Sequence, residues 1–461
     1  MSGSGFTSQQ RRIIMLMVIA VIVVLAMLAG FVVASLRNLG SIAPVATLAF
    51  ISPPGLASTP PPTSPAPSPT PDESIWSQVQ AARLFGQIAH QVETQRGLSP
   101  HAEVPLSFLD EGEMTALLRQ LYTERDPQAR LLPYVALGLL PDTPITMRAS
   151  QAPAIYVPEQ EQLYVAASRQ ESSADAQALL AHAYIHALQD QYFGLQSVDA
   201  RAVTTDAKLA VQSLIEGDAM LSTAIYSYQD PAATEWEHLT DLIVQAEQPD
   251  YGEALGGSKA WTRLQRFPYW EGRRFVSALF RAGEWGAVNR AYTDLPRSTE
   301  QVLHPERYLD ELDSPTRVVV PDLGLVLDED WTMALQDTLG EFVVGLYLDE
   351  MLPEGEGWRA ADGWDGDTFV VWEHGESGHQ VRVWRTVWDS TAEATEVEQA
   401  FTALVPQRYL PAWPVEPPAG QSGYWWEIDA GAVHVRRVAR YVLFAQAPDL
   451  NTLANVVRIL P

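Results

Sequence analysis

The feature that most constrains the fold is a stretch of good helix formers at residues 175–193, which contains neither glycine nor proline. Its composition predicts a helix. His182 and His186 lie four residues apart in this stretch, so a helix projects them from one face, one turn apart. Two imidazoles at that spacing can bind the same metal ion.

The spacing of the two histidines matches the zinc-hydrolase pattern H-E-x-x-H, in which the glutamate after the first histidine is the general base. Ala183 occupies that position here. General acid–base catalysis contributes a factor of roughly 10²–10⁴, and an alanine side chain has no group that can transfer a proton. Asp190 is a poor replacement, because it lies about 12 Å from His182 along a helix. The site is therefore predicted to hold zinc without activating water.

Composition limits the chemistry of this site. The chain has no cysteine, so histidine and carboxylate side chains must bind any metal ion. A length of 461 residues is enough for two or three domains. The net charge of -27 argues against a nucleic-acid partner, which would require a basic surface.

The N-terminal part of the chain predicts a membrane anchor. Residues 13–36 are apolar and uncharged, and a helix of that length spans about 36 Å, enough to cross a hydrocarbon layer of about 30 Å. A cleaved signal peptide usually has an apolar core of only about 7–15 residues. Two arginines precede the run, which predicts a cytoplasmic tail at residues 1–12. We therefore expect a single-pass membrane protein with its bulk outside the cytoplasm and a proline-rich linker at residues 37–73.

Beyond the linker we predict an α+β fold in two domains. Residues 74–320 favour a mainly helical domain with a short β-hairpin at 154–166, and residues 321–461 favour an α+β domain. Besides the histidine helix, the first domain has predicted helices at 74–96, 110–124, 126–140, 205–228 and 268–283. The second has predicted strands at 368–372, 380–388, 425–428, 432–438 and 441–445 and a helix at 392–404.

Several motifs extend beyond the two histidines. They are HALQDQYF at 186–193, EGDA at 216–219, STEQVLHPE at 298–306, ALGLL at 136–140 and GWDGD at 363–367. In these motifs the chain resembles a family of bacterial and archaeal surface proteins that are classed as zinc metallopeptidases of the gluzincin type. The resemblance covers roughly residues 75–400.

The resemblance implies a site and a function. His182 and His186 align with the first two zinc ligands of the family, and Glu216 aligns with the third. His304 is implied, more weakly, to line the cleft. The family has its catalytic glutamate at the position of Ala183. The resemblance therefore implies a zincin-like domain at residues 74–320 in a non-catalytic homologue that can bind zinc and a peptide.

The residues themselves agree with such a site. Three protein ligands and an open fourth position form a catalytic type of zinc site. A ligating histidine usually donates its other ring N–H to an acceptor, and Asp190, Asp206 and Asp218 are candidates for that role. The strands predicted within residues 154–166 are expected to align an extended peptide by β-augmentation.

Two alternatives remain open. An active peptidase would need a non-standard general base. A structural or cell-wall-binding protein would carry no metal, and Glu216 would then be a buried ion-pair partner of Arg201 or Arg273. Carbohydrate binding would use the aromatic side chains of the C-terminal domain, which are Trp364, Trp372, Trp384, Trp388, Trp413, Trp425 and Trp426.

Overall fold

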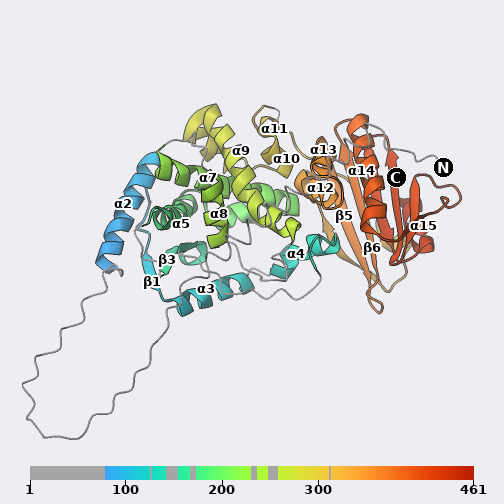
Figure 1. The fold of residues 1–461 in the computed structure, drawn as a ribbon, viewed down its shortest axis with the longest axis horizontal. Coiled ribbons are helices and arrows are strands. Elements are labelled where there is room, and N and C mark those ends of the chain that lie inside the picture. Colours follow the sequence, from blue (N-terminus) through green and yellow to red (C-terminus); the bar gives the residue numbers. More distant parts are fainter. Residues whose placement is uncertain are drawn as a thin grey trace, which may run out of the picture. The chain divides into compact units, whose positions relative to one another are not determined.

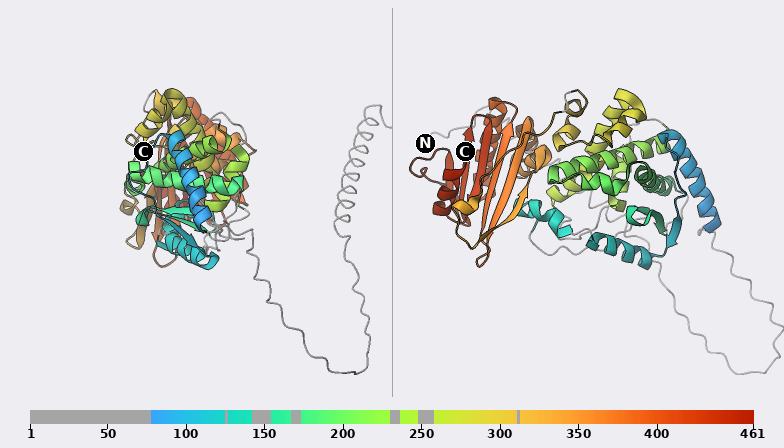
Figure 2. Two further views of the ribbon diagram at one scale, coloured as in Figure 1. Left: turned by 90° about the vertical axis from the view of Figure 1, so that its left-hand side faces the viewer. Right: turned by 180° about the vertical axis from the view of Figure 1, so that it is seen from behind.

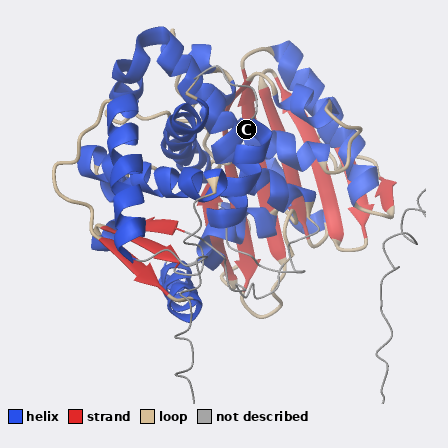
Figure 3. Ribbon diagram, turned by 60° about the vertical axis from the view of Figure 1, so that its left-hand side comes forward, coloured by secondary structure: helices blue, strands red, loops and turns tan. Residues whose placement is uncertain are grey.

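The computed structural model describes residues 78–124, 127–141, 154–166, 173–229, 236–247, 258–310 and 313–461. The chain divides into two units, residues 1–70 and 71–461, and all described residues belong to the second. This second unit is α+β (Figure 3): helices and a three-stranded sheet come first in the chain, and a seven-stranded sheet with its own helices follows.

The predicted transmembrane helix requires a correction. In the part of the chain that the structure describes, no helix is both long enough and apolar enough to cross a membrane. The longest helices, α5 (Ala174–Phe193), α7 (Thr205–Tyr228) and α9 (Lys259–Ala291), contain charged and polar residues that are costly in hydrocarbon. The predicted span at 13–36 lies outside the described residues, together with the predicted tail and linker. The described residues are α+β, and they contain no helix that supports the predicted transmembrane span or the single-pass, extracytoplasmic localisation derived from it.

Helices α5, α7 and α9 form the centre of the helical part (Figure 1), joined by α2 (Gln78–Arg96) and α8 (Trp236–Glu247). Side-chain caps fix where α5, α7 and α9 begin, and Ser258 caps α9. Ser173 accepts a hydrogen bond from the first turn of α5, and Thr204 does the same for α7. α7 packs along α9 more extensively than any other pair of elements, and α5 and α2 pack across α7.

Helix α9 differs from its prediction. We predicted a helix from Pro268 to Gly283, but the helix begins at Lys259, and Pro268 lies in its interior. Proline removes one hydrogen bond there without ending the helix, because the surrounding packing holds it. Gly283 and Glu284 leave the helical conformation, so the predicted end is a kink inside a longer helix.

The predicted hairpin is confirmed as β2 (Ala154–Val157) and β3 (Gln162–Ala166), which pair antiparallel across a 3-10 turn, η1 (Pro158–Gln160). The strand β1 (Leu106–Leu109) adds to β3 in parallel and was not predicted. β2 packs against α5. The remaining elements of this part are α3 (Glu111–Glu124), α4 (Pro127–Ala136), α6 (Leu195–Ala200), α10 (Thr299–Leu303) and α11 (Pro305–Leu309).

The C-terminal sheet is antiparallel, with strand order β4-β5-β6-β10-β9-β8-β7. Helices α12 and α14 lie on one face and α15 lies on the other (Figures 1 and 2). The strands are β4 (Trp331–Asp337), β5 (Trp364–His374), β6 (Gln380–Trp388), β7 (Ala412–Pro414), β8 (Tyr424–Ile428), β9 (Gly431–Val438) and β10 (Tyr441–Ala447). The helices are α12 (Gly340–Asp349), α13 (Glu356–Ala361), α14 (Thr391–Arg408) and α15 (Leu450–Ile459), with a 3-10 turn, η4 (Leu323–Leu325), before them.

All five strands predicted in this part, and the helix predicted at 392–404, are confirmed. Aromatic side chains explain how the sheet holds its helices. Phe369, Trp384 and Phe444 lie in one row across β5, β6 and β10. Tyr347 of α12 and Phe401 of α14 pack against this row.

The hydrophobic core continues across the boundary that we predicted near residue 320. One cluster of buried side chains includes residues of α7 and α9 as well as residues of α12, α14 and the large sheet. The ring centroids of Phe267 on α9 and Phe342 on α12 lie 3.9 Å apart. The two predicted domains therefore share a core.

Candidate metal centre

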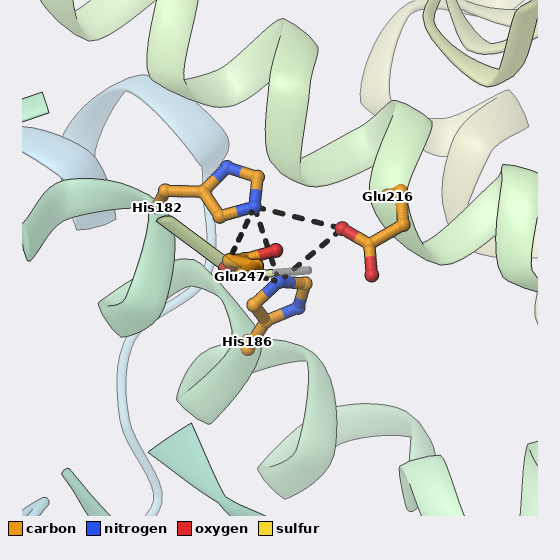
Figure 4. A group of neighbouring side chains, drawn as sticks. All are labelled: His182, His186, Glu216 and Glu247. Atoms are coloured by element: carbon orange, nitrogen blue, oxygen red, sulfur yellow. Dashed lines mark hydrogen bonds and ion pairs between the residues drawn. The ribbon is translucent and has the colours of Figure 1, made fainter. Parts of the chain in front are cut away.

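Four side chains from three helices converge on one point (Figure 4). His182 and His186 come from α5, Glu216 comes from α7, and Glu247 is the last residue of α8. The two Nε2 atoms lie 3.2 Å apart. Glu216 Oε2 lies 3.5 Å from each of them, and Glu247 Oε1 lies 3.4 Å from that of His182 and 3.8 Å from that of His186.

These distances suit ligands of one ion better than hydrogen bonds. A tetrahedral zinc ion with bonds of about 2.0–2.1 Å holds its ligand atoms about 3.3 Å apart. Charge-assisted hydrogen bonds between nitrogen and carboxylate are about 2.7–2.9 Å long, shorter than any of the four histidine–glutamate distances. Glu216 Oε2 is also buried without a hydrogen-bond partner, which is unusual for a carboxylate unless a cation satisfies it.

The hydrogen bonds of Gln189 fix the tautomer of His186. The Gln189 amide nitrogen donates to the carbonyl of Ile215 and to the hydroxyl of Tyr292, at 2.9 and 3.0 Å. Its oxygen must therefore accept, and it lies 2.8 Å from Nδ1 of His186. Nδ1 of His186 carries the hydrogen, which leaves the lone pair on Nε2.

Thr223 fixes the tautomer of His182 in the same way. The threonine hydroxyl donates to the carbonyl of Ala219 at 2.7 Å, so its oxygen accepts from Nδ1 of His182 at 3.1 Å. Both imidazoles therefore direct an Nε2 lone pair toward the same point. Two lone pairs at that distance repel each other unless a proton or a metal ion lies between them.

The electrostatics of the site favour positive charge. Burial lowers the pKa of His182, but the Glu247 and Glu216 carboxylates outweigh burial and raise that pKa to about 10 in the absence of a bound cation. The pKa of His186 also rises, since Glu216 outweighs burial there. Burial raises the pKa of Glu216, but the two histidines outweigh it and lower the pKa to about 2. Two protons or one divalent cation can supply this charge.

Ala183 lies where the catalytic pattern requires a glutamate. Its side chain is 1% exposed and belongs to an apolar cluster formed by α2, β2, β3 and α5. Among the described residues, the metal-binding group contains no carboxylate besides Glu216 and Glu247. If this group holds a metal ion, both carboxylates are ligands of it and neither can also transfer protons.

Asp190 and Asp206 do not reach the histidines. Asp190 accepts hydrogen bonds from the Tyr156 hydroxyl at 2.9 Å and from the Leu195 backbone at 2.8 Å, which ties α5 to β2 and α6. Asp206 accepts from the backbone N–H and hydroxyl of Thr299, at 2.7 and 2.6 Å. The structure thus places these two predicted acceptors in structural roles.

Asp218 does not contact the two histidines and acts on the site through Gln189. It forms a buried bidentate ion pair with Arg96 at 2.8 and 3.0 Å, and it accepts a hydrogen bond from Tyr292 at 2.9 Å. Its Oδ2 also lies 3.2 Å from the amide nitrogen of Gln189. Asp218 therefore orients Gln189, which in turn orients His186.

Glycines explain how α7 presents Glu216. A Cβ atom on Gly217 would lie 2.2 Å from the carbonyl oxygen of Gly272, and one on Gly272 would lie 2.2 Å from that of Ser213. Both glycines are thus required for the close crossing of α7 and α9. The Glu216 side chain forms ion pairs with His182 and His186, whereas Arg201 bonds the carbonyl groups of residues 292 and 293.

His304 belongs to a different group. Its Nε2 lies 3.0 Å from Glu341 Oε1 and 3.7 Å from Asp362 Oδ1, and it is not one of the four side chains that converge in Figure 4. The hydrogen bond that His304 donates to the Glu341 carboxylate has the largest effect on the pKa of His304 and raises it. The structure therefore places His304 in an ion pair at the start of α11.

Glu247 is the member of the converging group that the sequence analysis missed. No motif marks it, because it stands at the end of an amphipathic helix far along the chain from both histidines. The sequence of α8 shows only an amphipathic pattern, and its apolar residues Leu239, Ile243 and Ala246 are buried in the structure. That pattern predicts a packed helix and says nothing about what its last residue contacts.

The tryptophans of the C-terminal part mostly serve its core. Those at 364, 384, 388, 425 and 426 are buried, and Trp372 is half-buried. Trp413 alone among the seven is exposed. A sugar-binding platform of several exposed rings is therefore not formed by this set.

Comparisons with known proteins concern only the C-terminal part. A domain of unknown function, DUF8575, matches residues 331–457, which include the seven-stranded sheet. The four residues of the candidate metal centre lie outside this match. Neither the curated proteins nor the solved structures contain a match to the chain.

Proposed function

We propose that this protein is a gluzincin-like relative of zinc metallopeptidases that binds zinc and does not hydrolyse peptides. The observation that carries the proposal is the convergence of two Nε2 atoms and two carboxylate oxygens at separations of 3.2–3.8 Å. Imidazole and carboxylate ligands in a tetrahedral arrangement suit zinc. Magnesium and calcium favour oxygen ligands, about six or more in number.

Loss of hydrolysis follows from the residues around the ligands. Zinc would supply Lewis acidity, but hydrolysis also needs a group that takes a proton from water and returns it to the leaving amine. Ala183 cannot do this, and its surroundings are apolar. The site can therefore retain a metal ion after losing catalysis.

The proposal includes an extended peptide as a ligand. β2 stands at the edge of the three-stranded sheet in the order β1-β3-β2 and packs on the helix that carries both histidines. Tyr156 of β2 donates to Asp190 of that helix. Such an edge strand can pair with the backbone of a peptide.

Metal analysis of the purified protein tests the proposal. We expect about one zinc ion per chain, and loss of that zinc in His182→Ala and His186→Ala. His379→Ala is the matched control, because His379 is exposed on a turn of the C-terminal sheet. Absence of stoichiometric zinc would favour the metal-free structural alternative, and chelator-sensitive cleavage of an unfolded protein by the unmodified chain would show an active peptidase.

A further inference from the structure

We propose that Glu247 is a fourth protein ligand of the metal centre and that the bound cation fastens α8 to α5 and α7. This inference rests on the proposed zinc binding and adds a structural role for the ion. It also assigns the position that a catalytic zinc site leaves open for water.

Glu247 and Glu216 lie at similar distances from the two histidine Nε2 atoms. Glu247 Oε1 lies 3.4 and 3.8 Å from the two Nε2 atoms, and Glu216 Oε2 lies 3.5 Å from each. The two side chains are 20% and 12% exposed. Together with the histidines they offer four ligand atoms, the number that closed sites of structural zinc use.

A buried tyrosine orients Glu247. The hydroxyl of Tyr269, on α9, donates to Glu247 Oε2 at 3.0 Å, and Tyr269 is almost fully buried. This hydrogen bond occupies one carboxylate oxygen and leaves Oε1 directed at the histidines. Thr223 and Gln189 do the same for His182 and His186, so each of these three ligands has a fixed partner behind it.

Helix α8 is short and packs on the core through one apolar face. It is 12 residues long, and helices of that length are marginal without packing. Its buried apolar side chains are Leu239, Ile243 and Ala246. Its ion pairs, from His238 to Asp175 and from Asp241 to Arg266, each include at least one exposed side chain and contribute little. A coordinate bond to Glu247 would add to this packing a direct link from the end of α8 to α5 and α7.

Hydrogen exchange of the full-length protein tests this role. With zinc bound, amides of α8 should exchange slowly, and removal of zinc with a chelator should speed their exchange by about tenfold or more. The strands of the C-terminal sheet should not respond. Glu247→Gln should exchange in α8 as the zinc-free protein does, even with zinc present, whereas Glu237→Gln, an exposed change on the same helix, should match the unmodified protein.

Cobalt(II) substitution tests the ligand itself, independently of helix stability. The visible spectrum of cobalt(II) reports its coordination number. The unmodified protein should give a tetrahedral spectrum that added acetate leaves unchanged, because four protein ligands close the site. In Glu247→Ala the open corner should accept acetate and the spectrum should change.

The outcomes separate the two proposals. A protein that binds no zinc contradicts the proposed function. A protein that binds zinc through His182, His186 and Glu216, responds to acetate without any substitution, and shows equal exchange of α8 with and without zinc would contradict the role of Glu247 alone.

Discussion

The Nε2 atoms of His182 and His186 lie 3.2 Å apart, and each ring donates its Nδ1 hydrogen in another direction, to Thr223 and to Gln189 respectively. This arrangement prepares two lone pairs for one cation. Helix geometry supplies the spacing of the rings, and the two acceptors supply their orientation.

Gln189→Ala should weaken zinc binding by about 10–100-fold, because His186 loses the acceptor that fixes its tautomer. Competition with a chromogenic chelator measures the affinity. Gln191→Ala is the control, since Gln191 bonds the 101–102 loop instead. Unchanged zinc affinity in a folded Gln189→Ala protein would show that the ring is held by other contacts.

Ala183→Glu by itself should not restore peptide hydrolysis. The new carboxylate would enter an apolar cluster, at a cost of about 1–3 kcal/mol or more, and Glu247 would still fill the corner that water needs. The double variant Ala183→Glu with Glu247→Ala should show chelator-sensitive cleavage of an unfolded protein if it folds, as circular dichroism would verify. Cleavage by the single variant would mean that Glu247 does not close the site.

Asp206 should make the protein less stable as pH rises. Burial, reinforced by Asp367 and Glu341, raises the pKa of Asp206 from 3.8 to about 8 despite the two bonds from Thr299. The folded state therefore binds the proton more tightly than the unfolded state, so the stability contribution is complete below about pH 4 and is lost as pH rises through about 8.

Asp206→Asn should remove this dependence, because asparagine keeps an oxygen for Thr299 and carries no charge. Denaturant unfolding between pH 4 and 9 would measure the effect. The slope of the stability curve should be reduced in the variant compared with the unmodified protein. An equal slope in both would show that Asp206 is ionised throughout in the folded state.

Gly217→Ala should destabilise the protein by about 1–3 kcal/mol or more, because the added Cβ would lie 2.2 Å from the carbonyl oxygen of Gly272. Gly86→Ala is the control. Gly86 lies on α2 with nothing near its Cβ position, so this change should be neutral or stabilising. Thermal unfolding compares the two, and a tolerated Gly217→Ala would mean that α7 and α9 can move apart.

Much of the C-terminal fold was predictable because its strands follow simple local rules. β6 and β9 alternate or run apolar between turn residues, and both were predicted within a residue or two. β4 was missed although Trp331, Met333 and Leu335 alternate along it, because this outer strand is mostly exposed and interrupted by a bulge after Met333. α12 was missed for the opposite reason: all its residues are buried, so its sequence has no period to detect.

Sequence alone determined the pairing of His182 with His186 and the absence of a general base at Ala183, because four residues make about one helical turn wherever the helix lies. Tertiary structure decided the rest of the site. It brought Glu247 to the histidines, moved His304 into a separate ion pair, and replaced the predicted aspartates by Thr223 and Gln189. These contacts join helices whose relative positions depend on packing, such as the glycine contact between α7 and α9, and no local spacing encodes them.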